Sequence, residues 1–105
     1  MLESYIQKRV EEIKSFTITE IEDQLRNTGI YINTETLVVT VTDSEGEDVT
    51  EAMLDSATIL GTNHRTIRFT IKAGEASINP YRIDIQFLDT DDNKYSLVFS
   101  LRVFE

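Results

Sequence analysis

Residues 66–105 constrain the fold most, because three runs within them alternate apolar and polar side chains. Period-two alternation is typical of antiparallel strands that bury one face. We therefore expect three half-buried strands joined by polar turns. Their inward positions are Ile67, Phe69 and Ile71; Tyr81, Ile83, Ile85 and Phe87; and Tyr95, Leu97, Phe99, Leu101 and Val103.

Shorter runs of the same kind occur earlier in the chain. Residues 15–19 and 56–60 read as brief strands, and residues 36–42 place Leu37, Val39 and Val41 on one inward face. About six short strands at regular spacing predict a mainly β fold, an immunoglobulin-like antiparallel β-sandwich. Residues 19–29 favour a short helix or an irregular loop, and Met53 and Leu54 are expected to enter the core from a short segment.

The first fourteen residues show a different pattern. Leu2, Ile6, Val10 and Ile13 recur at spacings of four, four and three, as on one side of a helix. We expect an N-terminal amphipathic helix over residues 1–14 and the sandwich domain over residues 15–105. The apolar stripe either covers its own domain or docks on a partner, and the sequence leaves both readings open.

Composition excludes some functions. The 105-residue chain has a formal net charge of −9, which disfavours nonspecific binding to nucleic acid or an anionic membrane. Without cysteine it has no disulfide and no thiolate site. The start lacks the features of a signal peptide, and no apolar run reaches membrane-spanning length, so we expect a cytoplasmic location in the producing cell.

Two acidic loops, 43–48 and 89–93, could offer oxygen ligands to calcium. Neither matches a known calcium loop, and Asp, Asn and Gly are also favoured in plain turns, which is the reading we adopt. His64, the only histidine, follows Asn63 in an expected hairpin turn and gains no assigned role. We expect no catalytic residue, no metal and no cofactor.

Gly74 and Tyr81 form a possible structural corner. Tyr81 opens a strand seven residues after Gly74, which resembles the tyrosine corner of sandwich domains, in which the hydroxyl bonds to upstream backbone. The alternative is an ordinary core aromatic residue with its hydroxyl at the rim.

Several outward strand positions are apolar, and such a patch either receives the helix or meets another chain. Together with the stripe they are the candidate protein-interaction residues: Leu2, Ile6, Val10, Ile13, Val38, Leu88, Val98 and Phe104.

From about Phe16 onward the chain resembles small immunoglobulin-like structural proteins of tailed bacteriophages and prophages, of the neck or tail-adaptor type. The residues that carry the resemblance are Val39-Thr40-Val41, Gly46, Met53-Leu54, Gly61, Phe69-Thr70-Ile71-Lys72-Ala73-Gly74, Tyr81-Arg82-Ile83-Asp84-Ile85, Lys94-Tyr95 and Leu101-Arg102-Val103-Phe104-Glu105. The resemblance implies a non-enzymatic virion protein without catalytic residues. Its expected partners are copies of itself or other phage neck and tail proteins, with no nucleic acid, membrane or obligatory small molecule.

The alternative function is a carbohydrate- or ligand-binding sandwich module, whose site would lie in loops at one end of the sheets. Such a module predicts exposed loop aromatics, for which Tyr31 alone qualifies. An enzymatic function has no supporting set of nucleophile, base and orienting group.

Overall fold

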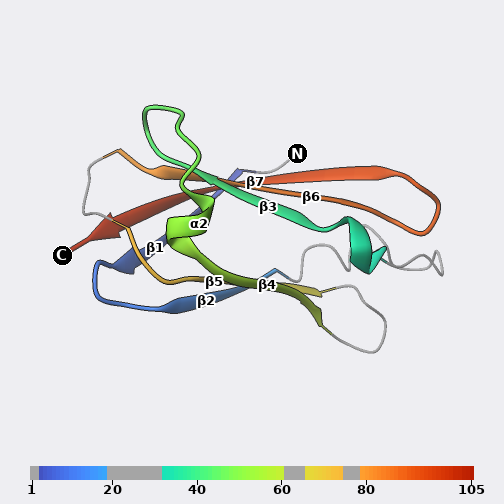
Figure 1. Ribbon diagram of the computed structural model, residues 1–105, viewed down its shortest axis with the longest axis horizontal. Coiled ribbons are helices and arrows are strands. Elements are labelled where there is room, and N and C mark those ends of the chain that lie inside the picture. The colour runs from blue at the N-terminus through green and yellow to red at the C-terminus, as the bar shows by residue number, and fades with distance from the viewer. Residues whose placement is uncertain (1–2, 19–31, 61–65, 75–78) are drawn as a thin grey trace.

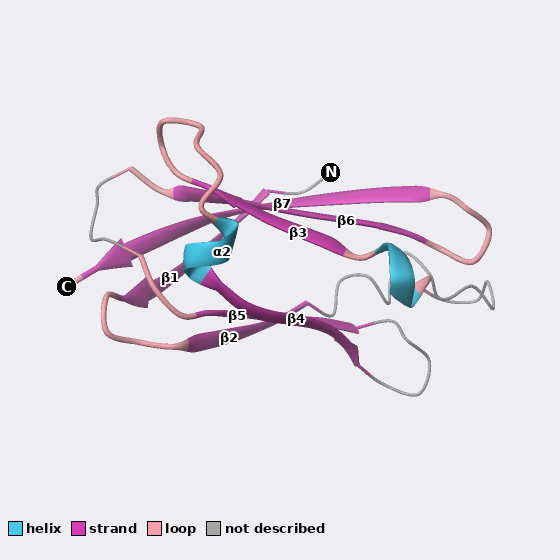
Figure 2. Ribbon diagram, in the orientation of Figure 1, coloured by secondary structure: helices cyan, strands magenta, loops and turns pink. Residues whose placement is uncertain are grey.

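The computed structural model describes residues 3–18, 32–60, 66–74 and 79–105, and these fold into two packed β-sheets (Figure 1). Strand dominates the described residues, which also contain two short helical segments (Figure 2). A mainly β, two-sheet sandwich was predicted from the alternation, and this is confirmed. No helix in the part of the chain that the structure describes has the length and apolar character needed to cross a membrane.

The larger sheet has four strands in the order β1-β7-β6-β3. β6 pairs antiparallel with β3 and β7, whereas β1 runs parallel to β7, so the prediction of a wholly antiparallel sandwich is wrong at this edge. The strand bounds are β1 Glu3–Arg9, β3 Val38–Thr42, β6 Tyr81–Leu88 and β7 Lys94–Phe104.

The smaller sheet is antiparallel and has the order β2-β5-β4. Its strands are β2 Lys14–Ile18, β4 Leu54–Leu60 and β5 Thr66–Ile71. The 3-10 turn η1 (Thr34–Thr36) precedes β3, and the one-turn helix α2 (Thr50–Met53) joins the acidic loop after β3 to β4. The expected helix or loop over 19–29 and the turn at 61–64 lie outside the described residues.

The core lies between the two sheets and contains the inward residues that alternation predicts. Val41, Ile67, Phe69, Ile83 and Leu101 are fully buried, and Met53 drops into the core from α2 as expected. Phe69 packs against Phe16 of its own sheet and Phe99 of the other, with ring centroids 5.4 and 6.1 Å apart. Such contacts between the layers hold the sandwich together.

The predicted N-terminal helix over residues 1–14 is wrong, because residues 3–9 form strand β1. A spacing of four is shared by a helix and a strand, since every fourth residue also lies on the same strand face. Ile6 and Val10 therefore fit both structures. The period-two pattern was hidden because the inward position between them is Lys8. Ile13, the position that fits only the helix, is 70% exposed.

Candidate interaction surface

The apolar residues proposed for partner contact do not gather into one patch. Ile13 lies exposed in the turn between β1 and β2, and Val38 is 55% exposed at the start of edge strand β3. Leu88 and Phe104 are half-buried on β6 and β7, whereas Val98 is 7% exposed on central strand β7. Only Ile13 and Val38 therefore offer large exposed apolar side chains among the described residues.

The rest of the N-terminal stripe is not a separate docking face. Ile6 and Val10 are half-buried and pack against the core, so they belong to the sandwich itself. Leu2 lies outside the described residues. The stripe was expected either to cover its own domain or to dock on a partner. Ile6 and Val10 contact the core of their own domain, and Ile6 does so from strand β1 rather than from a helix.

Lys8 is a buried cation that the sequence pattern did not single out. Its side chain is fully buried and its Nζ donates to the carbonyls of Arg9 and Glu12 at 2.8 and 2.9 Å, with a longer contact to Val10 O at 3.4 Å. Burial lowers the pKa of the Lys8 ammonium, and the Glu12 carboxylate opposes part of that shift. Lys8 thus fastens the turn that carries the chain from one sheet to the other.

The outer edge of β1 is closed by side chains of the next turn and strand. Lys14 Nζ donates to Gln7 O at 3.1 Å, and Glu12 Oε1 accepts from Arg9 N at 2.6 Å. The β1 amide of Arg9 and carbonyl of Gln7 are therefore occupied within the chain. Caps of this kind hinder strand addition at the C-terminal end of β1.

The outer edge of β3 is closed at Val41 in a similar way. Val41 N donates to Thr50 Oγ1 at 2.8 Å, and Val41 O accepts from Val49 N at 2.8 Å. The Thr50 hydroxyl in turn donates to Asp48 Oδ1 at 2.6 Å, and Thr50 N donates to the same oxygen at 2.9 Å. These two hydrogen bonds lower the pKa of Asp48, and the bond from the Thr50 hydroxyl contributes more than the bond from the Thr50 amide. The sequence signal that could have predicted this turn is a threonine two residues after an aspartate, because the aspartate carboxylate can accept from the amide and hydroxyl of that threonine.

A shallow groove lies on the same side of the sandwich, between the start of β3 and the edge strand β4. It has a volume of about 270 Å³ and is lined by Leu37, Ala57, Thr58 and Ile59. Leu37, Ala57 and Ile59 also pack against the core, so the groove exposes the margin of the apolar interior.

Charge is distributed unevenly around the sandwich. The stretch 32–60, which contains β3, α2 and β4, has no lysine or arginine. Its acidic residues are Glu35, Asp43, Glu45, Glu47, Asp48, Glu51 and Asp55. The segments that form the β3 and β4 edges therefore carry only acidic charge, which attracts cationic partners, and the nearby Arg68 and Arg82 lie one strand further in, paired with Thr58 and Thr42.

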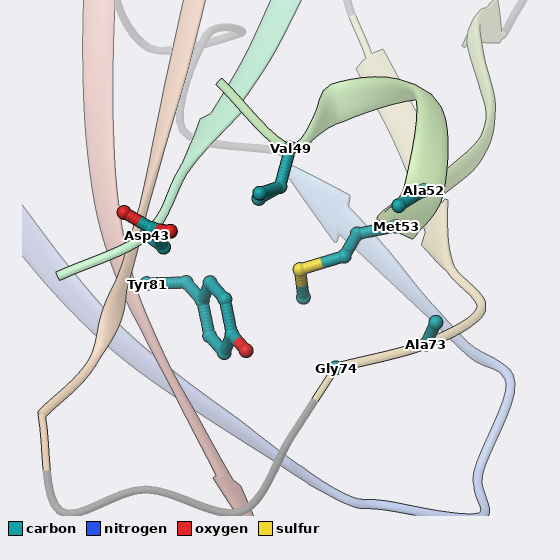
Figure 3. Close-up of a pocket in the computed structure, with 7 residues that line it drawn as sticks. All are labelled: Asp43, Val49, Ala52, Met53, Ala73, Gly74 and Tyr81. Carbon is teal, nitrogen blue, oxygen red and sulfur yellow. The ribbon is translucent and has the colours of Figure 1, made fainter. Parts of the chain in front are cut away.

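A second hollow lies at the end of the sandwich where α2 meets the start of β6. It has a volume of about 500 Å³, and Met53 and Tyr81 project into it from opposite walls (Figure 3). Gly74 forms its floor with φ +131°, and a Cβ there would lie 2.9 Å from Met53 Cε. The structure thus brings Gly74 and Tyr81 to one cavity, while the corner hydrogen bond remains a prediction.

The acidic loops are organised by their own backbone. Asp43 Oδ1 accepts from the amides of Glu45 and Glu47, which accounts for its place in that turn. Asp89 is fully buried, and its carboxylate accepts from the backbone amides of Asp91 and Asn93.

Two side chains complete the Asp89 site. Asn93 Nδ2 and the Tyr95 hydroxyl donate to Asp89 Oδ2 at 3.1 and 2.9 Å. Burial acts to raise the pKa of Asp89, but these hydrogen bonds outweigh it and leave the pKa lowered. Among the described residues, no three histidine, aspartate or glutamate side chains are grouped so as to hold a metal ion. His64 lies outside those residues.

Comparison with known proteins gives a likeness in structure and none in sequence family. The chain matches no protein-family model and no curated protein. The crystal structure of CopC from Methylosinus trichosporium OB3b is 18% identical over 71% of this chain and 70% of that chain, with a TM-score of 0.47.

Proposed function

We propose that this chain is a non-enzymatic structural or assembly module of a bacteriophage or prophage virion, an immunoglobulin-like domain that acts through protein–protein contacts. The observation that carries the proposal is the exposed Val38 at the start of an edge strand. An exposed apolar side chain at a sheet edge, next in the chain to the groove residue Leu37, suits contact with another chain. The resemblance of the chain from about Phe16 onward to phage sandwich modules gives the class of partner, namely copies of the chain or neck and tail proteins.

Particle incorporation tests this proposal. Virions purified from the producing cell are digested and examined by mass spectrometry for peptides of this chain. We expect the chain in particle fractions, and expect Val38→Lys to lower its incorporation. The matched control is Thr17→Lys, which places the same charge at an exposed position of β2 in the other sheet. Absence of the chain from intact particles would reject the virion role.

Ligand binding is the second candidate function, and the cavity beside Tyr81 favours it. A recess of about 500 Å³ has the size of a small-molecule site, and a tyrosine on its wall can stack on a sugar ring or an aromatic group. A glycan array with wild type and Tyr81→Ala tests this function. Binding that is lost in Tyr81→Ala would support it, and the absence of any hit would count against it.

A further inference from the structure

The register of the smaller sheet determines which backbone groups of β4 face outward. Lys72 N donates to Met53 O at 2.8 Å, so the backbone of β5 points toward β4 at this residue. Hydrogen-bonding direction alternates along a strand that has neighbours on both sides. Thr70 and Arg68 therefore also bond toward β4.

The partners of Thr70 and Arg68 on β4 are Ser56 and Thr58. The residues that alternate with them, Ala57 and Ile59, consequently direct their N–H and C=O groups away from β5. No hydrogen bond to these outward groups occurs within the part of the chain that the structure describes. This differs from β3, where Thr50 and Val49 occupy the outward groups of Val41.

The side chains of the same two residues line the groove described above. Ala57 and Ile59 thus offer outward backbone groups at the sheet edge and an apolar recess beside them. An extended chain needs both: hydrogen bonds for its backbone and a recess for alternate side chains.

We propose that the β4 edge binds an extended segment of a partner protein that carries lysine or arginine, which adds to the smaller sheet as a strand. This deepens the proposed function, since it states the chemistry of the partner. The positive charge follows from complementarity. Asp55 is exposed on β4 itself, Glu51 is exposed on α2, which leads into β4, and Glu35 is exposed on η1, two residues before the groove residue Leu37. Residues 32–60 hold no cation.

A second copy of the chain is a poorer occupant. Pairing the β4 strands of two copies edge to edge would bring their acidic sides together. Like charges at an interface oppose association. The β1 edge of another copy is also a poor partner, because Lys14 and Glu12 already occupy its outward groups at Gln7 O and Arg9 N.

The probe is a short synthetic peptide in which lysine alternates with valine, with a glutamate-for-lysine peptide as its counterpart. We expect the lysine peptide to bind and the affinity to fall as salt screens the charges. Amide hydrogen exchange read by NMR should show new protection at Ala57 and Ile59. No binding, equal binding of the glutamate peptide, or protection confined to other strands would overturn the proposal.

Two variant pairs test the geometry and the charge separately. Ala57→Pro removes an outward amide and leaves the bonds to β5 in place, and its control, Thr17→Pro, does the same on the edge strand β2. Only Ala57→Pro should abolish binding. If it fails to fold, the double variant Glu35→Lys with Asp55→Lys, set against Glu11→Lys with Glu105→Lys, provides the test. All four positions are exposed and each pair changes the net charge equally.

The first charge pair should weaken binding about tenfold and the second should leave it nearly unchanged. Equal loss of peptide affinity in both charge pairs would overturn the proposal. Self-association of the free protein through the β4 edge, seen as a concentration-dependent rise in mass by light scattering, would also overturn it. The two proposals fail separately. If the peptide does not bind, the binding proposal fails, and particle incorporation still tests the virion role. If the chain is absent from particles, the virion role fails, and the peptide experiment still tests binding at the β4 edge.

Discussion

The two lateral sides of the sandwich close their sheet edges differently. On one side, formed by β1 and β2 and here called the stitched side, Lys8 holds the connecting turn while Lys14 and Glu12 cap the β1 backbone. On the other, formed by β3 and β4 and here called the acidic side, Val41 is the one strand residue whose outward N–H and C=O groups are both capped within the part of the chain that the structure describes. An edge strand invites pairing unless something blocks it. Among the described residues the outward backbone groups of Ser15 and Thr17 on β2 are also uncapped, so what distinguishes the acidic side is the groove and the acidic charge beside β4.

The largest effect is expected on the stitched side. Lys8→Ala removes the donor to two turn carbonyls and leaves a cavity, which should lower the free energy of unfolding by about 3 kcal/mol. Lys8→Met keeps most of the stem's packing and should cost about 1 to 2 kcal/mol. Urea denaturation monitored by circular dichroism measures both. Equal stability of Lys8→Ala and wild type would show that the lysine does not fasten the turn.

A smaller effect is expected where the acidic side is capped. Thr50→Val removes the acceptor for Val41 N and should lower the unfolding free energy by about 1 to 2 kcal/mol. The control is Thr17→Val, an exposed threonine on the stitched side, where a change within about 0.5 kcal/mol is expected. If the two variants are equally stable, the hydroxyl of Thr50 does not close the β3 edge.

Acid should loosen the cap on the acidic side. Hydrogen bonds from Thr50 lower the pKa of Asp48 in the folded protein. A depressed carboxyl pKa contributes stability that is present above the unfolded-state value, about 3.9, and is lost as the pH falls through the folded-state value. Wild type should therefore lose stability relative to Asp48→Asn on acidification. A stability difference that stays constant between neutral pH and pH about 2 would contradict this cause.

Much of the fold follows from alternation, because inward residues such as Phe69, Ile83 and Leu101 keep one face of each strand apolar. The strand at the N-terminal segment could not be predicted in this way, because the spacing of Ile6 and Val10 fits both a helix and a strand. The inward Lys8 removed the signal that separates the two. A lysine is rarely fully buried, and only its contacts with turn carbonyls explain why this one is.

The candidate surface was less predictable than the fold. Ile13 and Val38 are exposed, and their contact with a partner stays a prediction. The outward direction of the Ala57 and Ile59 backbone depends on strand order and register. Side-chain patterns carry no information about which backbone groups lack a neighbour. The absence of lysine and arginine from residues 32–60 can be read from the sequence. That these residues form one side of the sandwich follows only from the strand order of the two sheets.

Amide hydrogen exchange in the free protein tests the central claim most directly. Val41 and Arg9 donate to Thr50 Oγ1 and Glu12 Oε1, so their amides should be protected, whereas the outward amides of Ala57 and Ile59 should exchange rapidly. The β1 edge would then be closed at Arg9, and the β4 edge would be open at Ala57 and Ile59. Slow exchange at Ala57 and Ile59, comparable to that at Val41, would contradict this account.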